Sequence, residues 1–160
     1  MLRDTKKLTY VAVLIVLSFI GSLIKVQGSI AFDSMPAFFG ALFMGPVYGA
    51  IVGALGHLLT SFTSGFPLSL PLHILIAVEM GVFTYVFGIL YKKNRAIGIA
   101  VLILLNSVVG AFLAALVAQM FGMELAGKAM FAALIVPLVL ASAANAVLAS
   151  AVYEVIKKRM

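Results

Sequence analysis

Six side chains able to do polar chemistry stand out in an otherwise apolar sequence. They are Asp33, His57, His73, Glu79, Asn106 and Asn145. Carboxylates and imidazoles brought together could transfer protons, bind a metal ion or hold the polar groups of a ligand. His57 and His73 are sixteen positions apart, and the sequence contains no HExxH, Walker A or GxSxG motif. The spacing therefore favours ligand binding over catalysis or metal binding, and we expect no cofactor.

The composition indicates where these residues must work. The 160 residues are 64% hydrophobic and only 10% charged, whereas soluble domains are usually about 45–50% apolar and about 25% charged. This excess excludes an ordinary cytosolic enzyme or DNA-binding domain, because only a lipid bilayer can solvate so much apolar surface. We therefore expect no nucleic-acid partner. We expect a single integral membrane domain over residues 1–160, with no cysteine to form a disulfide or thiolate site.

The apolar segments predict an all-α membrane protein, a bundle of six transmembrane helices. The expected spans are 8–24, 34–44, 46–62, 72–91, 96–121 and 129–156. Gly45-Pro46 separates the second span from the third, because proline suits the first turn of a new helix. The second span is short for a bilayer, which requires roughly 20 residues. Five spans, with the second and third joined, is therefore the alternative.

The basic residues favour six spans. With six, one face carries Arg3, Lys6, Lys7, Lys92, Lys93, Arg95, Lys157, Lys158 and Arg159, and only Lys25 and Lys128 lie opposite. Cytoplasmic loops are enriched in Lys and Arg, so we expect both termini to be cytoplasmic. The polar segments 25–34 and 61–71 then face outward.

Glu79 is the most informative of the polar residues, because it lies about two turns into the fourth span. A carboxyl group in lipid must be paired, protonated or directed into a polar cavity. The alternative to ligand binding is a structural partner, either a histidine or Asn106. Asp33 either caps the second span or contacts a ligand. Phe32 and Phe66, with Phe38 and Phe62, are candidates for flat apolar walls of a site beneath the outer segments.

The stretch from Pro36 to His57 resembles the membrane-embedded S component of energy-coupling factor (ECF) transporters. It has a proline, an apolar run, Gly45-Pro46 and glycines spaced along the third span, Gly49 and Gly53. The resemblance implies a transport subunit and not an enzyme, located in the bacterial inner membrane. It implies capture of a vitamin-like molecule under the outer segments, and partnership with a transmembrane coupling subunit and two cytosolic ATPases.

The same resemblance implies two finer assignments. The docking motif of the family, Ala-x-x-x-Ala on the first span, has its nearest match at Ala12 and Val16, with a second row of small residues at Ser18 and Ser22. Segments 28–34, 56–68 and 73–80 most resemble the group assigned to α-ribazole, a cobalamin precursor, whose benzimidazole would suit aromatic walls.

Other functions remain open at this point. Folate, pantothenate and pyridoxine components share the same frame. A structural membrane subunit, or a membrane enzyme that uses His57, His73 and Glu79, is a further alternative.

Overall fold

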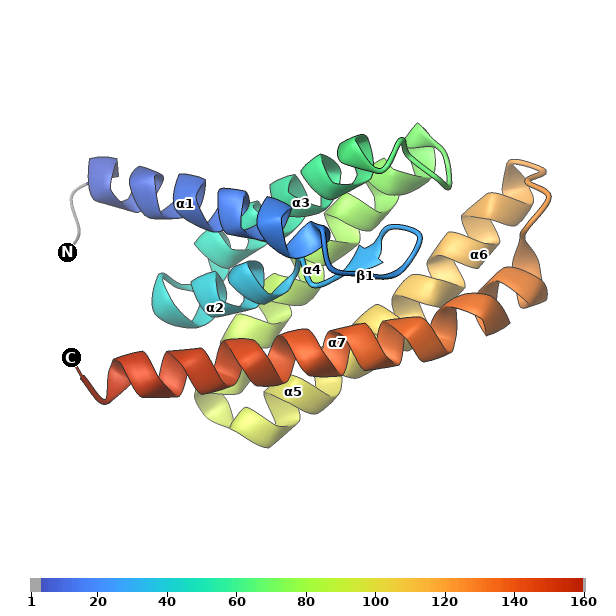
Figure 1. Cartoon of the computed structure of the whole chain (residues 1–160). Helices are drawn as coiled ribbons and strands as arrows, with labels where there is room; N and C mark the ends of the chain where they lie inside the picture. The colour runs from blue at the N-terminus through green and yellow to red at the C-terminus, as the bar shows by residue number, and fades with distance from the viewer. Residues whose placement is uncertain (1–3, 160) are drawn as a thin grey trace.

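Helices stand at all six predicted places in the computed structural model of the chain, which describes residues 4–159 (Figure 1). Arg3, one of the basic residues counted above, lies outside the described residues. The helices are α1 (Asp4–Ser22), α2 (Met35–Phe43), α3 (Pro46–Thr63), α4 (Leu70–Lys93), α5 (Arg95–Leu104), α6 (Ala111–Met120) and α7 (Gly127–Lys157). A π-helical stretch, η1 (Leu105–Gly110), joins α5 and α6 into one continuous rod.

Four of these helical segments are long and apolar enough to cross a membrane. They are Thr5–Ser22 in α1, α4, the rod Arg95–Met120 and α7. The structure is thus that of a helical membrane protein with four helices of spanning length. α2 has only nine residues and is too short to cross a bilayer by itself, so six full crossings stay a prediction.

The predicted boundary at Gly45-Pro46 is confirmed. The Met44 N–H donates to the Gly40 carbonyl and closes α2, and Pro46 is the first residue of α3. Gly45 between them has φ 111°, a conformation that glycine adopts without steric cost. Joining the second and third spans into one long helix is therefore wrong.

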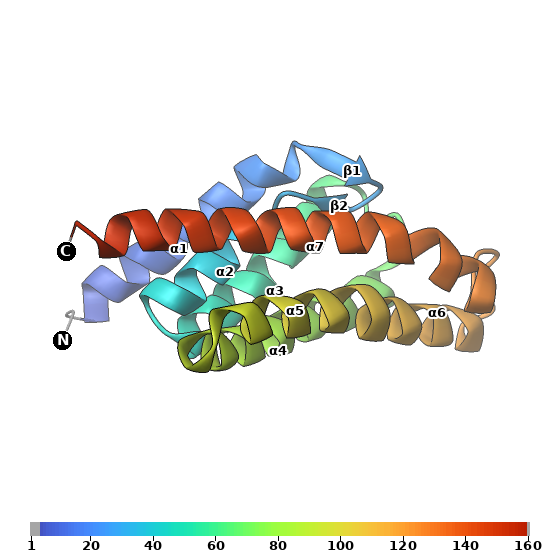
Figure 2. The same cartoon turned by 90° about the horizontal axis from the view of Figure 1, so that it is seen from below.

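The all-α expectation needs one correction, in the segment between α1 and α2. Strands β1 (Lys25–Gln27) and β2 (Ile30–Ala31) pair antiparallel as a small hairpin, with Gly28 in the turn at φ 54° (Figure 2). The Lys25 ammonium donates to the Ser64 hydroxyl over 3.1 Å, which ties the hairpin to the loop between α3 and α4. Strands this short have no periodicity that a sequence could reveal.

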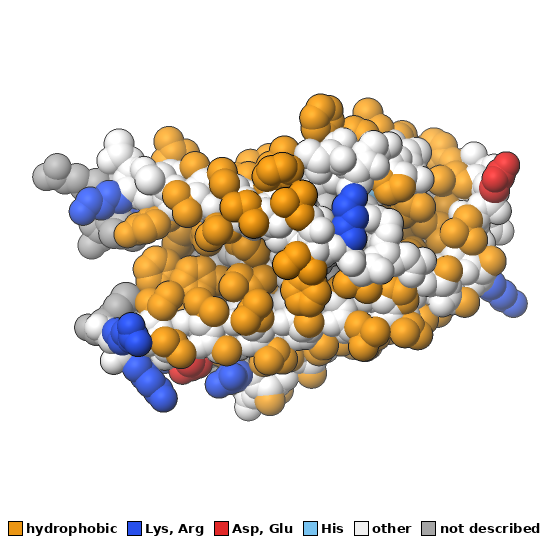
Figure 3. Space-filling model, viewed as in Figure 1, with side chains coloured by type: hydrophobic (Ala, Val, Ile, Leu, Met, Phe, Trp, Pro, Cys, Tyr) orange, Lys and Arg blue, Asp and Glu red, His pale blue; other side chains and the backbone are white. Residues whose placement is uncertain are grey.

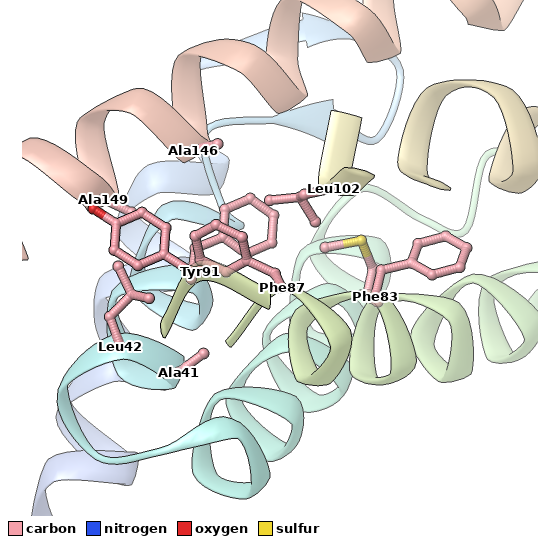
Figure 4. Close-up of a cluster of buried hydrophobic side chains, with 10 residues drawn as sticks. Ala41, Leu42, Phe83, Phe87, Tyr91, Leu102, Ala146 and Ala149 are labelled. Carbon is pink, nitrogen blue, oxygen red and sulfur yellow. The ribbon is translucent and has the colours of Figure 1, made fainter. Parts of the chain in front are cut away.

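A core of aromatic and small residues holds α2, α4, α5 and α7 together (Figure 4). Phe87 packs against Phe38 and Tyr91, with ring centroids 5.5 and 5.4 Å apart. Phe38 and Phe87 are fully buried. Phe38, predicted as a wall of the ligand site, is therefore a core residue instead.

Positive charge is concentrated at one end of the bundle. Figure 3 shows Lys and Arg side chains gathered where both termini lie, and only isolated ones elsewhere on that face. This segregation follows the predicted distribution of basic residues.

Candidate functional site

A hollow lies beneath the hairpin, between α3, α4, the central rod and α7. It encloses about 620 Å³ of space, its open mouth included. Its polar lining consists of Ser29, Asp33, Ser34, His57, Glu79, Asn106, Ser142 and Asn145. Its apolar lining consists of Ile30, Ala31, Leu68, Ile76, Met80, Gly110, Ala114, Leu134, Leu138 and Ala141.

The fold brings most of the predicted ligand residues to this hollow. Asp33, His57, Glu79, Asn106 and Asn145 all line it, although they come from five separate segments of the chain. His73, Phe32 and Phe66 are not part of the lining. Ser29, Ser34 and Ser142 were missed, because serines are common in membrane helices and loops and carry no distinguishing spacing.

Asp33 lies just after the hairpin that covers the hollow, and it is 6% exposed. One carboxylate oxygen accepts the Ser34 hydroxyl over 3.0 Å, and the other lies 4.0 Å from Nδ1 of His57. Burial raises the pKa of Asp33 to about 6, and the neighbouring hydroxyls of Thr60 and Ser34 offset part of that rise. The N-cap position of α2 belongs to Ser34, with no side-chain capping bond, so Asp33 does not cap the helix.

Asn145 caps α2 from outside. Its Oδ1 accepts the Met35 N–H over 2.8 Å, and its Nδ2 donates to the carbonyls of Ala31 at 3.2 Å and Ala141 at 2.8 Å. All of its polar atoms thereby have protein partners. The contribution of Asn145 to the hollow is to fix β2 and the start of α2 onto α7.

The two histidines form a hydrogen-bonded chain behind Asp33. His57 Nε2 lies 3.2 Å from His73 Nδ1, and the Ser61 hydroxyl lies 2.9 Å from that same Nδ1. The Leu68 N–H points at His73 Nε2 over 3.5 Å. The Leu68 N–H favours the neutral form of His73 with its proton on Nδ1, where the Ser61 hydroxyl oxygen and His57 Nε2 both lie within reach as acceptors.

His73 is fully buried and reaches the hollow only through His57. It positions His57 and does not contact the hollow itself.

Glu79 has no structural partner among the described residues. It is 7% exposed, and its Oε1 has no hydrogen bond. Asn106, its expected partner, instead donates to the Ser142 hydroxyl over 2.7 Å. Within residues 4–159, no three His, Asp or Glu side chains are grouped so that they could hold a metal ion.

The π-helical stretch shapes the wall opposite Glu79. It carries Asn106 and Gly110 into the lining. A Cβ on Gly110 would lie 3.4 Å from Glu79 Oε2, so glycine here leaves room beside the carboxylate. π-Helical turns occur frequently at functional sites. The sequence predicts an uninterrupted helix over 96–121 and gives no sign of this turn.

None of the expected phenylalanines lines the hollow, and the apolar part of its lining is aliphatic. Phe62 is 68% exposed, and Phe66 packs beside His73 with ring centroids 5.8 Å apart. Phe32 is half-buried, and its N–H donates to the Ile24 carbonyl. Phe66 and Ser69 both have positive φ, 49° and 87°, a conformation that residues with side chains rarely adopt. Such strained backbone clusters at ligand sites.

The predicted docking residues divide between two faces of α1. Ala12 and Val16 are exposed. Ser18 and Ser22 are buried; a Cβ on Gly56 of α3 would lie 3.0 Å from Ser18 Oγ. The serine row therefore packs inside the bundle, because glycine on α3 permits close approach, and it is not available to a partner.

The comparisons with known proteins identify one family. The sequence model of the family described as "ECF transporter, substrate-specific component" matches residues 6–157. No curated protein and no solved structure matches the chain significantly.

Proposed function

The chain belongs to the substrate-specific components of ECF transporters, and from this we propose that it captures a vitamin or vitamin precursor, with α-ribazole as the best candidate, at the outer face of the bacterial inner membrane. A substrate-specific component is a transport subunit of the membrane, and ATP hydrolysis belongs to its partner subunits. The proposed partners are one transmembrane coupling subunit and two cytosolic ATPases.

The observation that carries the proposal is the hollow itself. Its lining combines apolar walls with two carboxyl groups and an imidazole. Sites of this kind hold small organic ligands, with the few polar groups fixing orientation. The hairpin and the loop before α4, joined by Lys25 and Ser64, would roof the bound molecule.

α-Ribazole suits these groups. Its flat benzimidazole would lie against Ile76, Met80 and Leu134, and its ribose hydroxyls would donate to Asp33 and Glu79. Pyridoxine, folate and pantothenate are the alternative substrates.

Native mass spectrometry of the purified protein tests the proposal. We expect a retained small molecule, and α-ribazole should raise the thermal unfolding midpoint in detergent. Ala141→Leu, which fills the hollow, should abolish both effects. Ala151→Leu is the matched control, because Ala151 is exposed on the same helix. A protein that retains nothing and responds to no vitamin or nucleoside contradicts the proposal.

A further inference from the structure

The charged groups that line the hollow are acidic. Asp33 and Glu79 both line it, and none of its lining residues is a Lys or Arg. Lys25, the basic residue of the hairpin, is exposed and donates to Ser64. An anionic ligand would therefore meet two carboxyl groups and no lysine or arginine.

Glu79 is incomplete without a ligand. Its Oε1 is buried and unpartnered among the described residues, and a buried carboxyl oxygen without a donor is costly in apolar surroundings. Asn106, one of the two expected kinds of partner for Glu79, donates to the Ser142 hydroxyl instead. A ligand that carries an N–H, an O–H or a positive charge would complete this group.

The roof reinforces the same preference. The Ser34 hydroxyl donates to Asp33, and the Asn145 amide donates to two backbone carbonyls. These donors are already engaged by the protein and are not free to receive a carboxylate.

We propose that the hollow selects its ligand by charge: it accepts a neutral or cationic nitrogen base whose donors meet Glu79 and Asp33, and it rejects carboxylates. This inference rests on the proposed function and narrows it. Folate and pantothenate carry carboxylates at neutral pH and fall outside the class. α-Ribazole and pyridoxine fall within it.

Binding of a matched series to the purified protein tests the inference. Pyridoxine, pyridoxamine and 4-pyridoxic acid share one ring and differ in carrying a hydroxymethyl, an ammonium or a carboxylate group. With α-ribazole, folate and pantothenate they form the panel for calorimetry in detergent. Among the neutral and cationic compounds, we expect those that bind to have dissociation constants about tenfold or more below that of any carboxylate.

Glu79→Gln separates the chemistry of the carboxyl group from its size, because it keeps the shape of the side chain and removes the acidic group. It should weaken binding of the best base by about tenfold or more, the effect of losing a charged hydrogen bond. Glu124→Gln is the matched control at an exposed carboxylate, and thermal unfolding checks that both variants fold.

The outcomes separate the two proposals. Tight binding of folate or pantothenate, or unchanged binding in Glu79→Gln, overturns charge selection and leaves vitamin capture standing. If no compound of the panel binds and no molecule is retained on purification, both vitamin capture and charge selection are overturned.

Discussion

Asn145 is a single amide that connects three parts of the site. It holds β2, the first turn of α2 and its own helix α7 through three hydrogen bonds. Its removal would leave the Met35 N–H and the Ala31 carbonyl without these partners in a buried place.

We therefore expect Asn145→Ala to lower the free energy of unfolding by about 1–3 kcal/mol. Thermal unfolding in detergent measures the loss. Ser150→Ala is the matched control, since the buried Ser150 hydroxyl donates to the Ala146 carbonyl of its own helix. Equal effects of the two substitutions would show that Asn145 has no special role in the roof.

Asp33 predicts a pH dependence of stability. Its pKa rises from 3.8 to about 6 on burial, so the folded protein binds this proton more tightly than the unfolded chain. The stabilisation from this group is complete below 3.8 and is lost as pH rises through about 6. Asp33→Asn should make the thermal unfolding midpoint less dependent on pH between 3.8 and about 6. Glu124→Gln should leave this pH dependence unchanged. A profile identical to the parent protein would contradict the assignment.

The acidic and amide residues of the site were predictable because lipid gives such side chains no other favourable place. Asp33, Glu79, Asn106 and Asn145 all turn inward to the hollow. The aromatic residues were not predictable in this way. A phenylalanine is equally stable in a core, as Phe38 is, or toward lipid, as Phe62 is, so composition alone does not place it.

At the scale of the elements, the helices were predictable and their irregularities were not. Gly45-Pro46 separates α2 from α3 because both residues have strong local conformational preferences. The π-helical stretch from Leu105 to Gly110 and the hairpin over 25–31 depend on tertiary packing. No local preference in the sequence indicates either of them.

The contact between α2 and α3 depends on Gly49. A Cβ there would lie 2.6 Å from the Cα of Ala41, so the two helix backbones touch. Gly49→Ala should destabilise the protein by about 1–3 kcal/mol, as overpacking does. Gly81→Ala is the control, because its Cβ would meet nothing closer than 3.4 Å. Thermal unfolding that is the same for both variants would contradict this close approach.

The proposed docking face on α1 has its own test. Ala12 and Val16 are exposed, and Val136 on α7 is exposed to a similar extent. We expect Ala12→Trp to reduce copurification with the coupling subunit and ATPases, while ligand binding in detergent is retained. Val136→Trp should leave assembly intact. If the Ala12→Trp variant still copurifies with the coupling subunit and ATPases, the interface does not include this face of α1.

The orientation of the whole molecule is accessible because the chain contains no cysteine. Lys93 lies at the basic end and Glu124 in the loop between α6 and α7, and both are exposed. A membrane-impermeant maleimide applied to intact cells should label Glu124→Cys and spare Lys93→Cys, since basic loops remain cytoplasmic. Both should react after the membrane is permeabilised. The reverse pattern would invert the proposed topology.

The unequal lengths of the helices have a consequence for the surrounding lipid. The 31 residues of α7 measure about 46 Å at 1.5 Å per residue, against a hydrocarbon thickness of about 30 Å. The nine residues of α2 measure about 14 Å. Such hydrophobic mismatch is relieved when a long helix leans or when acyl chains stretch or compress beside the protein. Bilayer thickness therefore becomes a determinant of how this molecule sits, in addition to its own internal contacts.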